Sequence, residues 1–322
     1  MSLAGETSKR RGGRDARREL RAKPIPREEA AVKPGMLGGQ YKPLDDAGMQ
    51  RIHETALELM ETVGFGDAIP SCIELLTEKG CWMSDAGRLC IPRALVEETL
   101  KICGRDFILY GRDRKHDLRP SGNRAYFGTG GAAVHIADVE ANEYRESYLD
   151  DLYDCARLVD TCDHIHYFQR PLTARDMEDP RDLDINTLYA SLAGTSKHVG
   201  TSMVDPAHVE ECLAICHTVA GSEEEWRAKP FVSQSNCFVV PPMKFAEDAC
   251  RCLEVAVRGG MPVLLLSAGQ AGATSPAALA GTVSQAVAEC LAGLVYVNAI
   301  KPGAPAIWGP WPFVSDLRTG AM

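Results

Sequence analysis

The sequence lacks the features that would place the protein in a membrane or outside the cell. No run approaches the roughly 20 consecutive apolar residues that a membrane span needs. Four polar residues interrupt the most apolar long region, 276–300: Thr282, Ser284, Gln285 and Glu289. The N-terminus carries Arg, Lys and Gly where a signal peptide would carry an apolar core. The 322 residues are 45% hydrophobic and 25% charged, so we expect a soluble, cytoplasmic protein with no membrane partner.

Signatures of nucleotide binding are also missing. No Gly-x-Gly-x-x-Gly opens a helix after the first predicted strand, which argues against a dinucleotide-binding fold. The stretch Gly128-Thr-Gly-Gly131 lacks the Gly-Lys-Ser/Thr of a phosphate-binding loop. We interpret it as a turn that closes over the mouth of a site, with phosphate binding as the less favoured alternative.

Charge is distributed unevenly along the chain. Residues 1–40 hold ten Lys or Arg and five Asp or Glu, a net charge of +5, whereas the remainder carries −14. The basic arm has no aromatic residue on which a base would stack, and the acidic remainder would repel phosphates. We therefore predict a disordered basic tail over residues 1–40 and no nucleic-acid partner.

The twelve cysteines do not form the compact pattern of a small disulfide-rich domain. They are scattered through a long chain without an export signal, so we expect reduced thiols. The closest groups are Cys212-x3-Cys216, followed by His217, and Cys250-x-Cys252. Both groups fall within helical patterns, where cysteine usually packs as a small apolar residue. A metal or redox role is the less favoured interpretation.

Apolar runs and helical patterns alternate from residue 147 onward with the spacing of βα units. The strand-like runs are 164–169, 198–203, 231–236, 263–266 and 306–308. Nearly continuous apolar runs are typical of parallel strands that are buried on both faces. Small polar residues lie at or beside the ends of these runs, and barrel enzymes assemble their sites from such strand ends. They are Gln169, Ser202, Asn236, Ser267 and Gly269. The pattern favours a (β/α)8 barrel over an open sheet, with about five of the eight strands present.

The region before the predicted barrel has a different pattern. Residues 44–63 predict an amphipathic helix with Asp45 as its N-cap, and shorter helices follow Ser71 and Pro92. Short β-like runs and glycine turns occupy residues 106–148. We therefore predict an N-terminal cap region of helices and small sheets over 41–146 and an incomplete barrel over 147–322, whose first helix begins at a capping box, Ser147-x-x-Asp150.

Two groups of residues suggest competing chemistry. His164 and His166 lie two apart on one predicted strand, as in metal-dependent hydrolases, but they stand at the start of the strand and no third ligand follows at another strand end. We predict no metal site and keep a hydrolase as an alternative. Trp308, Trp311 and Phe313 lie after the last strand. Aromatic faces attract methylated ammonium groups, although such residues also simply pack loops.

Four stretches together resemble signatures of the trimethylamine methyltransferase family. They are Tyr126-Phe-Gly-Thr-Gly-Gly131, Gly194-Thr-Ser-Lys-His198, Leu266-Ser-Ala-Gly-Gln270 and Trp308-Gly-Pro-Trp-Pro-Phe-Val-Ser-Asp-Leu-Arg-Thr-Gly-Ala-Met322. They run from about residue 120 to the end of the sequence, and weaker similarity extends back to Tyr41. Any one stretch alone would not be specific.

The resemblance implies a (β/α)8 barrel that moves a methyl group from trimethylamine to the Co(I) corrinoid of a cognate partner protein, as in methylamine catabolism and methanogenesis. The corrinoid (cobalamin) belongs to the partner, so no cofactor is expected to be bound directly. In the trimethylamine branch, a pyrrolysine is thought to convert the neutral amine into a quaternary one. Betaine-type substrates are already quaternary and are the alternative. We expect the full-length protein to be a homo-oligomer.

No catalytic residue is carried over from the family, because the position that would activate the amine is expected beyond Met322. Candidate substrate-binding residues are instead those predicted at the barrel mouth: Tyr126, Phe168, Gln169, Gln234, Asn236, Ser267, Gln270, Trp308 and Phe313.

The motif 316–322 lies in the middle of the barrel in this family. We therefore expect that Met322 precedes an in-frame amber codon, with a shortened or degraded gene as the alternatives. A chain of residues 1–322 is then expected to be an inactive fragment.

Overall fold

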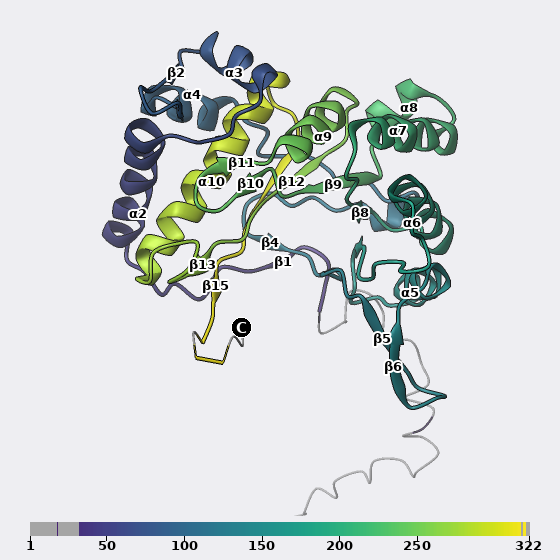
Figure 1. Ribbon diagram of the computed structural model, residues 1–322. Helices are drawn as coiled ribbons and strands as arrows, with labels where there is room; N and C mark the ends of the chain where they lie inside the picture. The colour runs from purple at the N-terminus through teal and green to yellow at the C-terminus, as the bar shows by residue number, and fades with distance from the viewer. Residues whose placement is uncertain (1–17, 19–31, 317, 320–322) are drawn as a thin grey trace, which may run out of the picture. The chain divides into compact units, whose positions relative to one another are not determined.

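A five-stranded parallel sheet organises the protein (Figure 1). The computed structural model describes residues 18, 32–316, 318 and 319. The strand order is β14-β12-β9-β8-β7. The strands are β7 (Phe168–Gln169), β8 (Val199–Thr201), β9 (Val232–Asn236), β12 (Val263–Ser267) and β14 (Ala306–Pro310). Every neighbouring pair is parallel, and each strand lies beside the next one in the chain. The predicted parallel βα order is confirmed.

Helices alternate with these strands and cover the outer face of the curled sheet (Figure 1). They are α5 (Leu149–Asp160), α6 (Pro180–Gly194), α7 (Pro206–Ala220), α8 (Glu223–Ala228), α9 (Glu247–Arg258) and α10 (Leu279–Ile300). Successive helices pack against one another, and α9 and α10 also contact β12. The fold is therefore a partial (β/α)8 barrel, as the sequence predicts.

Helices and small sheets also form the region before α5. It comprises α2 (Asp46–Glu58), the π-helical turn η2 (Leu59–Val63), α3 (Pro70–Thr77), α4 (Arg93–Ile102) and the 3-10 turn η3 (Arg114–His116). Its hairpins are β2 (Trp82–Met83) with β3 (Leu89–Cys90), and β5 (His135–Asp138) with β6 (Glu143–Glu146). Helices α2, α3 and α4 contact α10. Residues 34–322 form one compact unit, and the boundary that we predict at residues 146 and 147 stays a prediction.

Besides these two hairpins, three more two-stranded sheets of the described residues lie outside the main one. The first, β1 (Met36–Leu37), pairs antiparallel with β4 (Arg124–Ala125). The pair β10 (Val239–Val240) and β11 (Lys244–Phe245) is antiparallel, and β13 (Gln270–Ala271) with β15 (Phe313–Val314) is parallel. Because Met36 and Leu37 form a strand, the predicted disordered tail over 1–40 is wrong for these residues. Most of that tail lies outside the described residues.

The predicted N-cap of α2 is confirmed, and Asp205 caps α7 in the same way. Asp45 accepts a hydrogen bond from the backbone N–H of Gly48 at 2.6 Å, and Asp205 accepts one from Ala207 at 2.8 Å. The predicted capping box at Ser147 is displaced by one residue. Tyr148 is the N-cap of α5, and Asp151 accepts its backbone N–H at 2.8 Å. Ser147 is buried and donates instead to the carbonyl of Thr173 at 2.7 Å.

Helix α10 is the central helix of the core. It is the one described helix that is long and apolar enough to cross a membrane, but 78% of its most apolar window is buried within the protein. It packs between α2 and β12, and its interrupting polar residues Thr282, Ser284, Gln285 and Glu289 are buried as well. The helix therefore has the burial of a core helix in a soluble protein.

A buried lysine closes the C-terminal end of α5. The Nζ atom of Lys197 donates to the carbonyls of Val159 and Ile165 at 2.6 Å and to that of Cys162 at 2.7 Å. The last carbonyls of a helix have no partner within it, and Lys197 itself is only 2% exposed. This one side chain therefore joins the end of α5 to the start of β8.

We predict that Lys197→Met lowers the free energy of unfolding by about 3 kcal/mol, because it removes three buried charge-assisted hydrogen bonds to backbone carbonyls. Urea denaturation would measure the change. The control is Lys244→Met, which removes a half-exposed lysine with an ion pair to Asp67 and should cost less than about 1 kcal/mol. Equal costs for the two variants would contradict the structural role of Lys197.

Candidate functional site

A large cavity lies along the inner face of the curled sheet. Its volume is about 810 Å³. Ser235, Leu264 and Ile307 are register neighbours on β9, β12 and β14, and all three line the cavity. Side chains at alternate positions of a strand share one face, so Ser233 and Leu266 line it too. The inner face of β9 is thus polar, whereas that of β12 is apolar.

Glycine at position 200 makes room for a polar side chain on this face. Gly200 on β8 pairs with Gln169 on β7, and a Cβ atom at Gly200 would overlap the Gln169 side-chain amide. A strand glycine often marks such a close approach. Gln169 is also tied through its backbone to Thr129, whose hydroxyl accepts the Gln169 N–H at 2.9 Å and donates to its carbonyl at 2.5 Å. Because Thr129, Gly130 and Gly131 line the cavity, the predicted turn lies at the site.

Four aromatic side chains line the cavity: Tyr126, Tyr167, Trp308 and Trp311. The backbone N–H of Trp311 donates a hydrogen bond to the backbone carbonyl of Ser267 at 2.7 Å. Its ring lies 5.2 Å from that of Phe313. The aromatic wall therefore joins residues from before β7 to residues after the last strand of the main sheet.

The polar residues of the cavity include a neutral histidine. The two ring nitrogens of His198 contact the carbonyl of Tyr110 at 2.9 Å and the hydroxyl of Ser233 at 3.0 Å. Complete burial lowers the pKa of His198 to about 4, although the bond to Tyr110 opposes the shift. The imidazole is therefore uncharged near neutral pH.

The charged residues that line the cavity are two arginines, Arg124 and Arg170, and no acidic residue is among the described residues of the lining. Arg170 donates to the hydroxyl of Ser202 at 2.9 Å. Burial lowers the pKa of Arg170, and the nearby carboxylate of Asp184 opposes this shift. Asp184 itself accepts from the N–H of Val204 at 2.9 Å and contacts His208 at 2.8 Å.

The structure brings together three of the predicted site residues and separates the others. Tyr126, Gln169 and Trp308 line the cavity. Phe168 is fully buried on the outer face among residues of α5. Gln270 donates to the hydroxyl of Ser315, beside the segment that carries Phe313.

Three further predicted residues connect strands to other segments on the outer face. Gln234 donates to the carbonyl of Met203 at 3.2 Å, Asn236 donates to that of Ala249 at 2.9 Å, and Ser267 donates to Glu289. The predicted role of these residues in binding substrate has no support from their position. The strand ends lie within two residues of the predicted ones, but a shift of one residue along a strand reverses the face.

The histidine pair is divided between two environments. His166 is buried, and its Nδ1 accepts the backbone N–H of Phe127 at 2.9 Å, while its ring packs edge-on against Tyr126 at 5.9 Å. His164 is exposed. The described part of the chain contains no group of three His, Cys, Asp or Glu residues that would hold a metal ion. The hydrolase alternative therefore gains no support.

The cysteines pack as the sequence predicts. All twelve are free. Cys212, Cys216, Cys250 and Cys252 are fully buried in the helix layer. Burial raises the pKa of Cys212 to about 12, which keeps this thiol protonated and unreactive.

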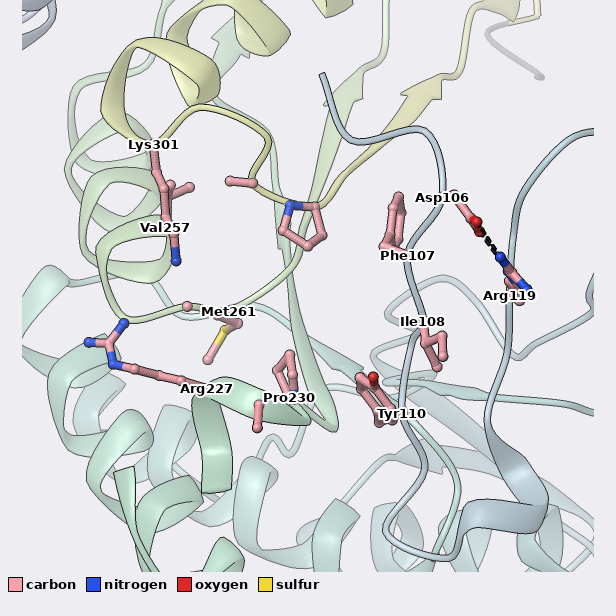
Figure 2. Close-up of a pocket in the computed structure, with 14 residues that line it drawn as sticks. Asp106, Phe107, Ile108, Tyr110, Arg119, Arg227, Pro230, Val257, Met261 and Lys301 are labelled. Carbon is pink, nitrogen blue, oxygen red and sulfur yellow. Dashed lines mark hydrogen bonds and ion pairs between the residues drawn. The ribbon is translucent and has the colours of Figure 1, made fainter. Parts of the chain in front are cut away.

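A second, smaller cavity lies at the opposite ends of the strands (Figure 2). Its volume is about 470 Å³, and Pro230, Met261 and Pro305, which come just before β9, β12 and β14, line it. Figure 2 shows the ion pair between Asp106 and Arg119 on one wall.

The segment 106–119 separates the two cavities. Leu109 and Leu118 exchange backbone hydrogen bonds of 2.8 and 2.9 Å and line the large cavity. Their neighbours Ile108, Tyr110 and Arg119 line the small one. This segment is therefore the floor of the large cavity.

Comparison with known proteins identifies the family. The profile of the trimethylamine methyltransferase (MTTB) family matches residues 10–322. The chain belongs to this family. The resemblance read from the four sequence motifs is thereby confirmed.

The curated relatives of this family member are longer. Trimethylamine methyltransferase MttB1 of Methanosarcina mazei is 30% identical over 279 residues, which cover 84% of this chain and 56% of the relative. Trimethylamine methyltransferase MttB of Methanosarcina barkeri matches with the same identity and coverage. A glycine betaine methyltransferase of Desulfitobacterium hafniense is 28% identical over 294 residues, which cover 89% of this chain and 60% of the relative. The chain thus spans little more than half the length of these relatives.

Among solved structures, the hydroxylamine complex of MtmB aligns with a TM-score of 0.40 and 11% identity. The alignment covers 84% of this chain and 60% of that one.

We predict that His198 makes the stability of the protein depend on pH. The unfolded chain binds a proton near the ordinary histidine pKa of about 6.5, whereas the folded protein keeps His198 neutral until about pH 4. The free energy of unfolding should therefore fall by up to about 3 kcal/mol as the pH drops through this window. Denaturation of the parent and of His198→Gln at several pH values measures this contribution, which the variant should lose. Ser233→Ala, which removes only a partner of the ring, should retain it; a parent and a His198→Gln protein with the same pH dependence would refute the prediction.

Proposed function

We propose that this chain binds the methylated amine in a protein that transfers a methyl group from trimethylamine to the cobalt of a corrinoid carried by a separate partner protein. The observation that supports this proposal best is the aromatic lining of the large cavity in a member of the trimethylamine methyltransferase family.

Aromatic rings suit this substrate because of their charge distribution. The face of an aromatic ring attracts a methylated ammonium group with about 0.5–2 kcal/mol per contact. Tyr126, Tyr167, Trp308 and Trp311 provide such faces on one cavity. The neutral His198 adds no positive charge that would repel the ligand. The chain thus has the residues to orient a methylated ammonium group and to exclude water around it.

The chemistry of the leaving group limits what this chain does alone. A neutral amine is a poor leaving group unless its nitrogen is made quaternary, and the family resemblance implies a pyrrolysine for that step. No residue of 1–322 is assigned the role of making the nitrogen quaternary. We propose that residues 1–322 bind the amine without transferring its methyl group, and that the transfer requires the further length present in the curated relatives.

We predict that Trp311→Leu and Trp308→Leu each weaken the binding of tetramethylammonium by about twofold to thirtyfold, because each variant removes one aromatic face. Isothermal titration calorimetry on the chain gives the affinities. Trp82→Leu is the matched control, since Trp82 is similarly exposed on the distant hairpin β2–β3. Failure of the parent chain to bind tetramethylammonium, or equal losses in all three variants, would contradict the proposed site.

A betaine-type substrate is the second candidate, and Arg170 favours it. A betaine joins a quaternary ammonium to a carboxylate. Arg170 lies on the cavity wall, and no carboxylate in the described ranges lies within ion-pair distance of it. A half-buried guanidinium with unused donors is suited to a substrate carboxylate.

We predict that Arg170→Gln weakens the binding of glycine betaine by about tenfold and leaves that of tetramethylammonium equal or stronger, because only the first ligand has a carboxylate for Arg170. The two affinities are measured on the same protein samples by calorimetry. A parallel loss for both ligands would assign Arg170 a structural role and leave trimethylamine as the favoured substrate.

A further inference from the structure

Glu289 is a buried acid behind the wall of the large cavity. It lies on α10 and is 0% exposed. One carboxylate oxygen accepts the hydroxyl of Ser267, at the end of β12. The other accepts the backbone N–H of Met243 at 2.9 Å and the side-chain amide of Gln285 at 3.0 Å. Three donors from three segments therefore converge on one carboxylate.

This carboxylate has no positive partner within the described residues. No Lys, Arg or His of residues 32–316 lies within ion-pair distance of Glu289. Burial raises the pKa of Glu289, and its three hydrogen bonds oppose the shift. Because all three bonds are donated to the carboxyl group, this geometry favours the ionised form. The three donors therefore stabilise the carboxylate form of Glu289, and no cationic side chain in the described residues offsets its charge when it is ionised.

A short path of contacts links Glu289 to the aromatic wall. Ser267, whose hydroxyl binds Glu289, accepts the N–H of Trp311 on its carbonyl at 2.7 Å. Two residues further on, the carbonyl of Gly269 accepts the N–H of Phe313 at 2.9 Å. Trp311 lines the cavity. Glu289 thus lies one residue behind the segment that carries the tryptophan.

The position of Glu289 matters because the charged side chains of the cavity lining are all positive among the described residues. The charged side chains of the lining are Arg124 and Arg170, so a negative charge that adds to the attraction of the aromatic rings has to come from behind the wall. The other buried acid nearby, Asp184, already contacts His208 and lies close to Arg170. Charges act over a longer distance in the protein interior than in water. Of these two buried acids, Glu289 is the one without a cationic partner in the described residues, and it lies behind the aromatic wall.

We propose that Glu289 is a specificity-determining residue, which makes the cavity prefer cationic methylated ammonium ligands over neutral ligands of the same shape. The proposal rests on the proposed function, because it concerns the same cavity. It differs from cation–π attraction in its origin, since it depends on a residue that touches no ligand.

A pair of isosteric ligands separates charge from shape. Choline carries a trimethylammonium group, and 3,3-dimethyl-1-butanol carries a neutral tert-butyl group in its place. Their affinities for the parent chain and for Glu289→Gln are measured by calorimetry at neutral pH. The variant should weaken choline binding about threefold to tenfold and leave the binding of the neutral alcohol unchanged.

The matched control is Glu254→Gln. Glu254 is a largely buried acid on α9 that accepts the hydroxyl of Tyr296 at 2.5 Å and lies away from the cavity lining. Its substitution removes the same charge from the helix layer and should not alter the ratio of the two affinities.

A second variant keeps the Glu289 carboxylate and its hydrogen bonding but neutralises its charge with a neighbouring cation. Gln285→Lys places a cation beside Glu289 in the position of the amide donor. If Glu289→Gln does not fold, this variant should reproduce the selective loss of choline binding. A parent that binds choline and keeps its preference in either folded variant would overturn the role of Glu289, and equal losses for both ligands would reduce that role to support of the wall. A parent that binds neither ligand would contradict the proposed function instead.

Discussion

The alternation of side chains across the curled parallel sheet is the constraint on which the site depends. Each strand has to satisfy two environments, because helices cover its outer face and the cavity lies along its inner face. On β9, Gln234 and Asn236 use the outer face to bond the carbonyls of Met203 and Ala249. Ser233 and Ser235 use the inner face to line the cavity. Neighbouring residues of one strand therefore have different tasks: some bond the strand to other segments, and others line the cavity.

The charges around the cavity follow from the same arrangement. Arg170 stands at the β7 and β8 side with Ser202, whereas the tryptophans stand at the β12 and β14 side in front of Glu289. His198 on the floor is neutral because it is buried between Tyr110 and Ser233. A ligand inside this cavity would meet the guanidinium of Arg170 at one side and the two tryptophans of the aromatic wall at the other. Of the two candidate substrates, a betaine would contact both sides through its carboxylate and its ammonium group, whereas trimethylamine has no group for Arg170.

The N-terminal region contributes directly to the barrel. The segment 106–119 supplies the floor of the cavity through Leu109 and Leu118. Arg88 donates to the carbonyl of Met243 at 3.0 Å, and the backbone N–H of Met243 donates to Glu289. These contacts join residues that lie far apart in the chain. They explain why residues 34–322 form one compact unit although the sequence pattern changes near residue 147.

The sequence by itself determined the kinds of element, their order and the family. Hydrophobic periodicity and helix capping are local properties of the sequence, so the N-cap at Asp45 and the parallel βα order can be predicted without a structure. The tertiary structure decided which side of each strand meets the cavity, because a shift of one residue reverses the face and the sequence of a strand buried on both sides does not mark it. The cavity is therefore lined by Tyr167, Trp311 and Ser233, which were not among the predicted site residues, and not by Phe168 and Gln234, which were. The structure also decided the hydrogen-bond partners of Lys197 and Glu289, since these come from segments that only folding brings together.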